Sequence, residues 1–186
     1  NFSVANLKLN TSTALPNSVN AETSPPSNYL ITITFNSNNL NRPALSVVRT
    51  FIHELIHAEI FRKLLECAKM PNLNFPNYTD PQWRNFITSL RNDYPGLYDY
   101  YLRYFFNVPA GQSASDEQHQ LMAQHYRDII VNTLKEYDNS LSENVYEALS
   151  WEGLKGTVAW NKLSSTERTD INTTISNFNN SNTNCQ

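Results

Sequence analysis

The sequence has only two cysteines among its 186 residues, and this scarcity excludes several classes of protein. Two thiols cannot build a disulfide framework, and they cannot form a structural zinc site made of four thiolates. Cys67 and Cys185 leave open a single bridge between the tail and the body, or two unpaired thiols with Cys67 as a small apolar residue on a helix. The sequence does not decide between these two states.

Long apolar runs and long basic runs are missing as well. Apolar stretches are interrupted every few residues, far short of the roughly 20 residues that span a bilayer, so no membrane partner is expected. The formal net charge is -3, and no cluster of Lys or Arg is long enough to follow a phosphate backbone. No nucleic-acid partner is therefore expected.

The start of the sequence shows neither a methionine nor a basic region followed by an apolar one. It begins at Asn1, so we expect a processed or excised piece of a longer precursor. Asparagine, serine and threonine are plentiful, a composition that favours a secreted or surface-delivered bacterial protein. Nothing in the sequence sets the oligomeric state, and a monomer is the default expectation.

The length of 186 residues is enough for one substantial hydrophobic core and short for two. Residues 1–28 are predicted to form an N-terminal extension, with an edge strand at 4–9 and a turn in SPPSN. Residues 29–178 are predicted to form the folded domain, and residues 179–186 a disordered tail. The expected fold class is α+β, mostly helical with a small β-sheet.

Hydrophobic periodicity divides the domain into one strand and several helices. Tyr29–Phe35 alternates between two faces and predicts a strand with one buried face. From 42 to about 70 the apolar residues cover more than one helical stripe, which predicts a central, mostly buried helix. Further helices are predicted at 79–94, 97–106, 116–137, 144–160 with breaks at Gly153 and Gly156, and 164–178 with a Ser164 and Glu167 capping box.

Two of the four histidines lie in the segment FIHELIHAE, inside the predicted central helix. In a helix, His53 and His57 point the same way, because residues four apart differ by about 40° in rotation and about 6 Å in height. Both can therefore reach one zinc ion, which binds neutral imidazole at about 2.0 to 2.1 Å and leaves room for a water. Glu54 lies about 100° further around the helix, beside that water rather than on the metal. The HExxH pattern thus predicts a zinc site with Glu54 as general base.

A catalytic zinc generally has three protein ligands, so the sequence must supply a third. His119 lies on the stripe of the 116–137 helix that we predict to face inward, and it is preferred over His125, which shares its side with more polar residues. Asp116 and Glu117 stay open as oxygen ligands, although the helix dipole already explains acidic residues in a first turn. The predicted inward stripe consists of His119, Met122, Tyr126, Ile129, Ile130, Thr133 and Tyr137.

Two further features leave alternatives open. In WEGLKGTVAW, Gly153 and Gly156 could make a turn that approaches the cleft, or a tight packing corner. Glu59, two residues after His57, points away from both histidines, which predicts a surface carboxylate or one that supports the site without binding the metal.

With these segments in view, the chain resembles zincin-type metallopeptidases. HELIHAEIFRKLLE, HQLMAQHYRDIIVNTLKEYD and ALSWEGLKGTVAW are similar to SprT-like and related metallopeptidase domains of Bacteroidota proteins, which are often C-terminal in large secreted or toxin-like polypeptides. The resemblance covers residues 29–165 and implies His53, His57 and His119 as zinc ligands, with Glu54 as general base. In the better-known SprT-like proteases the third histidine follows the helix more closely, and a cysteine zinc ribbon often comes after it.

The sequence therefore predicts a zincin-like domain that hydrolyses peptide bonds of a peptide or protein substrate through a zinc-activated water. If the strand Tyr29–Phe35 has an open edge along the cleft, an extended substrate could add to it as a further strand. Two alternatives stay open. One is a non-catalytic or toxin-associated binding module with a structural metal site, which four protein ligands and no water would favour. The other is zinc-dependent hydrolysis of a non-peptide amide.

Overall fold

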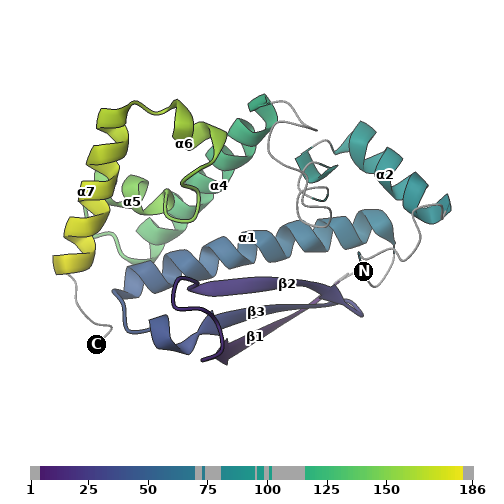
Figure 1. Ribbon diagram of the computed structural model, residues 1–186, viewed down its shortest axis with the longest axis horizontal. Coiled ribbons are helices and arrows are strands. Elements are labelled where there is room, and N and C mark those ends of the chain that lie inside the picture. The colour runs from purple at the N-terminus through teal and green to yellow at the C-terminus, as the bar shows by residue number, and fades with distance from the viewer. Residues whose placement is uncertain are drawn as a thin grey trace.

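The computed structural model of the chain describes residues 5–69, 73, 81–94, 96–98, 101 and 116–181, with the backbone alone for 116–126. Its fold is α+β, which confirms the predicted class: three strands form one small sheet, and helices make up most of the rest. One long helix lies between the sheet and the remaining helices (Figure 1). Within the described residues, none of the helices combines the length and the apolar character that crossing a membrane requires.

The sheet consists of β1 (Asn6–Ser12), β2 (Ala21–Ser27) and β3 (Leu30–Asn36), in the order β1-β3-β2. β1 runs parallel to β3, and β2 runs antiparallel to it. The predicted strand Tyr29–Phe35 is thus present, shifted by one residue, and the predicted edge strand at 4–9 is present as β1. The short 3-10 helix η1 (Ser37–Asn39) leads from β3 toward the central helix.

β2 corrects the prediction of a turn in SPPSN, because Ser24–Ser27 belong to the strand. Proline cannot donate to a ladder, but it is tolerated on an edge strand or at a bulge. Pro25 and Pro26 meet both conditions, since β2 is an edge strand and its register shifts between Ser24 and Ser27. The turn follows at Asn28 and Tyr29, whose φ values of 48° and 61° are typical of two-residue hairpin loops.

The central helix α1 (Ala44–Ala68) confirms the prediction for residues 42 to 70. It begins after Pro43 and ends at Lys69, whose left-handed backbone lets its amide donate to the carbonyl of Leu65. Phe61 is fully buried in a core shared with β3, whereas Ile52 packs into a second core with α4 and α5. Burial on both sides is why this helix shows no single apolar stripe.

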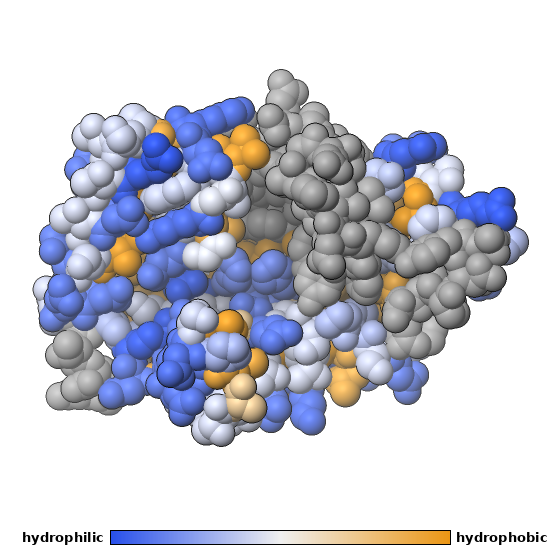
Figure 2. Space-filling view, in the orientation of Figure 1, coloured by the Kyte–Doolittle hydropathy of each residue, from blue (hydrophilic) through white to orange (hydrophobic). Residues whose placement is uncertain are grey.

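The other helices cover the side of α1 that faces away from the sheet (Figure 1). α2 (Pro81–Asp93) packs near the C-terminal end of α1. α4 (Asp116–Tyr137), α5 (Glu143–Ser150), α6 (Val158–Lys162) and α7 (Ser165–Ser181) gather over its N-terminal half. The surface over these last helices is mainly hydrophilic in Figure 2, with apolar residues in small separate groups.

Most predicted helices in this part of the chain are present, with two differences. α7 continues to Ser181, so residues 179–181 are helical rather than part of a disordered tail, and residues 182–186 with Cys185 lie outside the described residues. Of the predicted helix 97–106, residues 97, 98 and 101 are helical, and the others lie outside the described residues. The capping box is confirmed, because the Glu167 carboxylate accepts from the Ser164 amide at 2.7 Å and the Ser164 hydroxyl accepts from the Glu167 amide at 3.2 Å.

Candidate metal centre

His53 and His57 lie one turn apart on α1, and their Nε2 atoms are 3.1 Å from each other. Two nitrogens bound to one zinc at about 2.0 to 2.1 Å and at a tetrahedral angle lie about 3.3 Å apart. The two rings therefore already have the spacing that one shared zinc ion requires, and only a small adjustment separates them from ligand geometry.

The surroundings of the two rings favour the form that binds a metal. Burial, the neighbouring His57 and the Arg49 guanidinium lower the pKa of His53 to about 3, and burial also lowers the pKa of His57. Both imidazoles are therefore neutral at neutral pH. A neutral imidazole keeps a lone pair for a metal, whereas a protonated one does not.

Glu54 lies on the side of α1 that faces β2, and its side chain is buried. The Thr23 hydroxyl donates to Oε2 of Glu54 at 2.6 Å and also lies 3.1 Å from the backbone carbonyl of the same residue. Burial raises the pKa of Glu54, and it outweighs the hydrogen bond from Thr23 and the charge of Arg49, which both lower that pKa. A carboxylate with a raised pKa is a stronger base than an exposed one.

Thr23 is a site residue that the sequence did not reveal. It lies in β2, directly before the SPPSN segment that the sequence predicts as a turn, and it is 5% exposed. No periodic pattern links a threonine in this segment to a glutamate on a helix. Only the pairing of β2 with β3, which brings β2 against α1, places the hydroxyl on the carboxylate.

The turn between α5 and α6 lies against the ring of His53. A Cβ atom built on Gly153 would be 3.0 Å from Cε1 of that ring and 3.2 Å from Nδ1, a tight contact that would require the ring to shift by a few tenths of an ångström. Gly153 also has a φ of +84°, which favours glycine. Both interpretations of WEGLKGTVAW therefore hold, because Gly153 approaches the site while Trp151 and Trp160 pack together with ring centroids 5.3 Å apart.

A buried ion pair fastens this turn to α1. Arg49, one turn before His53, has a side chain that is 6% exposed, and its Nη2 atom lies 3.4 Å from Oε2 of Glu152. Its Nη1 atom also donates to the backbone carbonyl of Glu152 at 3.3 Å. The residue directly before Gly153 is thus held through both its side chain and its backbone.

The inward stripe predicted for α4 is only partly right in the half of the helix whose side chains are described. Ile130 is buried as predicted, but Ile129 and Tyr137 are 39% and 58% exposed, and the buried face instead continues with Val131 and Leu134. The buried stripe is therefore rotated by roughly one residue, or about 100°. The cause is that α4 packs against α5 as well as α1, so two neighbours set its buried face.

The third ligand consequently stays a prediction. α4 is helical from Asp116, as expected, but the side chains of Asp116, Glu117, His119 and His125 lie outside the described residues. Among side chains that the structure does describe, no group of three His, Cys, Asp or Glu could hold a metal. The described part of the chain brings together two imidazole nitrogens 3.1 Å apart and a buried carboxylate on the next residue.

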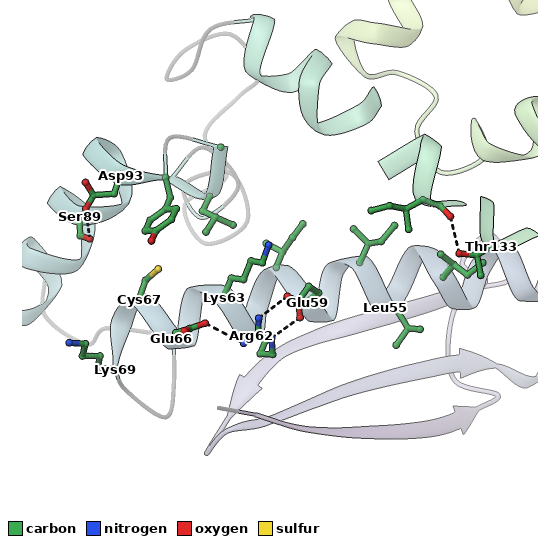
Figure 3. Close-up of a pocket in the computed structure, with 17 residues that line it drawn as sticks. Leu55, Glu59, Arg62, Lys63, Glu66, Cys67, Lys69, Ser89, Asp93 and Thr133 are labelled. Carbon is green, nitrogen blue, oxygen red and sulfur yellow. Dashed lines mark hydrogen bonds and ion pairs between the residues drawn. The ribbon is translucent and has the colours of Figure 1, made fainter. Parts of the chain in front are cut away.

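Carboxylates further along α1 lie away from the histidines. Glu59 is on the surface, where it accepts a hydrogen bond from Nε of Arg62 at 2.6 Å. Of the two roles predicted for it, this is the surface carboxylate. Leu55 and Glu59 come two residues after His53 and His57, about 200° around the helix. They line a cavity of about 990 Å³ between α1, α2 and α4 (Figure 3), and neither His53 nor His57 is among its lining residues.

Comparison with protein-family models, with curated proteins and with solved structures gives no match for this chain. Its function is therefore inferred from the residues of the site.

Proposed function

We propose that the chain is a zinc-dependent metallopeptidase with a zincin-like fold, in which His53 and His57 bind zinc and Glu54 is the general base. One observation carries this proposal. Two neutral imidazoles lie with their Nε2 atoms 3.1 Å apart on a central helix, and the residue after the first is a buried carboxylate. The donor set and its spacing both fit zinc.

The chemistry then divides between the ion and the chain. When bound, zinc supplies a water with a lowered pKa and polarises a carbonyl oxygen. Glu54 would take the proton of the attacking water and deliver it to the leaving amine. Its Oε2 atom accepts the Thr23 hydrogen bond, which helps to fix the orientation of the carboxylate.

The proposed substrate is a peptide or protein, and none of the described strands offers it an open edge beside the site. β3 cannot fulfil the prediction of an open edge, because β1 and β2 pair with its two sides. Among the described strands, β2 is the edge strand next to α1, and it carries Thr23 beside the proposed base. This part of β2 is already engaged, because the backbone of Thr23 also hydrogen-bonds to the Glu54 carboxylate, and Pro25 and Pro26 have no amide hydrogen to donate.

The proposal is tested by metal analysis of the purified protein and by cleavage of a peptide library. Wild type is expected to hold one zinc per chain, and His57→Ala is expected to lose it. Glu54→Gln is expected to keep the zinc and to lower kcat by about 10² to 10⁴, the usual contribution of a general base. Absence of zinc from the wild type would disprove the site, and full activity of Glu54→Gln would disprove the mechanism.

The third ligand is assigned by a separate pair of variants. We propose His119, so His119→Ala is expected to release zinc while His125→Ala keeps it. The reverse result would assign His125. Retention of zinc by both variants would direct the search to Glu117 and Asp116.

A further inference from the structure

We propose that Gly153 is a positioning residue for the His53 imidazole, held in place by the Arg49 and Glu152 pair. This inference rests on the proposed function, because the ring that Gly153 positions is a proposed zinc ligand. It adds a role for the turn between α5 and α6, which contributes no ligand of its own.

Gly153 lies near the end of the His53 ring that carries the proposed zinc-binding nitrogen. Cε1 of His53 is bonded to both ring nitrogens, and it is the ring atom nearest to the position that a Cβ of Gly153 would take, at 3.0 Å. Rotation of the ring about its bond to Cβ would carry Cε1 along an arc. A Cβ at Gly153 would push the ring along that arc, so the missing Cβ leaves the ring the room in which its Nε2 lies 3.1 Å from Nε2 of His57.

The turn between α5 and α6 can position the His53 ring only if the turn is itself held in place, and two arginines hold it. Arg49 on α1 contacts the carboxylate and the backbone carbonyl of Glu152, at 3.4 and 3.3 Å. Arg49 comes four residues before His53, so α1 carries both the proposed ligand and the arginine that holds the Gly153 turn. A movement of α1 therefore moves the His53 ring and the Gly153 turn together.

The second arginine fastens the beginning of the turn to α4. Nε of Arg127 donates to the Ser150 hydroxyl at 3.1 Å, and its guanidinium lies over the Trp151 ring at 4.0 Å from the centroid. Arg127 also pairs with Glu147 on α5. The turn is thus anchored to α1 and to the helix on which we propose the third ligand.

Gly156, three residues after Gly153, provides a matched control. Its φ is +93°, close to that of Gly153, but no heavy atom would lie within 4 Å of an added Cβ. Gly153→Ala and Gly156→Ala therefore introduce similar backbone strain, and only the first one introduces a contact with His53. The difference between the two variants isolates the contact.

Zinc affinity of the full chain, measured by competition with a chelator, tests the proposal. Gly153→Ala is expected to bind zinc about 10- to 100-fold more weakly than Gly156→Ala, the range typical for residues that orient metal ligands. In the metal-free proteins, the Hε1 resonance of His53 is expected to shift in Gly153→Ala and to stay at its wild-type position in Gly156→Ala. Equal zinc affinities of the two variants would overturn the positioning role.

Arg49→Lys decides the question if Gly153→Ala does not fold. Lysine keeps the positive charge but loses the planar group that contacts Glu152 at two points, so an effect of charge alone would leave the affinity unchanged. A loss of zinc affinity of about tenfold supports the positioning role, and wild-type affinity overturns it. Wild type without zinc would remove the proposed function itself, whereas zinc-loaded wild type with unaffected variants would remove only this inference.

Discussion

The two sides of α1 hold their proposed functional groups in different ways. On the sheet side, Glu54 is held by hydrogen bonds from the side chain and the backbone of Thr23, on an edge strand. On the helical side, the His53 ring lies where Gly153 lacks a Cβ, and the ion pair of Arg49 with Glu152 holds that turn to the same helix. The proposed base is thus directed by donors, one of which a substitution can remove, and the proposed ligand by the shape of its surroundings. Substitutions should therefore separate proton transfer from metal binding.

The largest expected effect comes from the cores on the two sides. Leu149 on α5 and Leu64 on α1 are both 0% exposed, so replacing either with alanine is expected to lower the free energy of unfolding by about 2 to 5 kcal/mol. Only Leu149 lies in the helix that leads into the Gly153 turn. Leu149→Ala should therefore also weaken zinc binding, whereas Leu64→Ala should not. Denaturant unfolding and chelator competition on both variants measure this, and equal zinc affinities would contradict the comparison.

An intermediate effect is expected on the sheet side. Thr23→Val keeps the size of the side chain and removes the donor to the buried carboxylate, which should cost about 1 to 3 kcal/mol of stability. Peptide cleavage should slow because Glu54 loses the side-chain donor and keeps only the backbone hydrogen bond of residue 23, while zinc affinity stays at the wild-type value. Thr23→Ser keeps the hydroxyl and should restore much of the activity. If Thr23→Val loses zinc and activity in parallel, the two sides are not separable.

The smallest effect is expected at a position remote from both groups. Ser164→Ala removes one half of the capping box of α7 and should lower Tm by about 2 to 4 °C. Zinc affinity and peptide cleavage should match the wild type, since α7 provides none of the groups of the site. A thermal melt and the two functional assays check this, and a change in zinc affinity would show that the site depends on general stability.

The same division explains what the sequence could predict. α1, β3, the helix break at Gly153 and the capping box at Ser164 depend on local patterns, namely periodicity, glycine and cap residues, and the structure contains all of them. The HExxH segment belongs to this group, because the spacing of its two histidines is a property of one helix.

The features that the sequence did not predict depend on distant contacts. β2 contains Pro25 and Pro26 and has little preference for a strand, and it is a strand because β3 offers it an edge. The contacts of Thr23 with Glu54 and of Gly153 with His53 join segments from different elements, which leave no periodic trace. The buried face of α4 was partly misassigned for the same reason, because α5 helps to set it.

The order of the sheet also has a consequence for the sequence of events during folding. β3 is the central strand although it comes last, so β2 can pair only when β3 has been made, through the local hairpin at Asn28, and β1 must join across the whole length of that hairpin. α1 then adds the two histidines, and all of α2, α4 and α5 separate them from Gly153. During synthesis, the chain contains the HExxH helix long before it contains the Gly153 turn, which we propose positions His53. If zinc binds as proposed, tight binding would be acquired late, after the last third of the chain has folded onto α1.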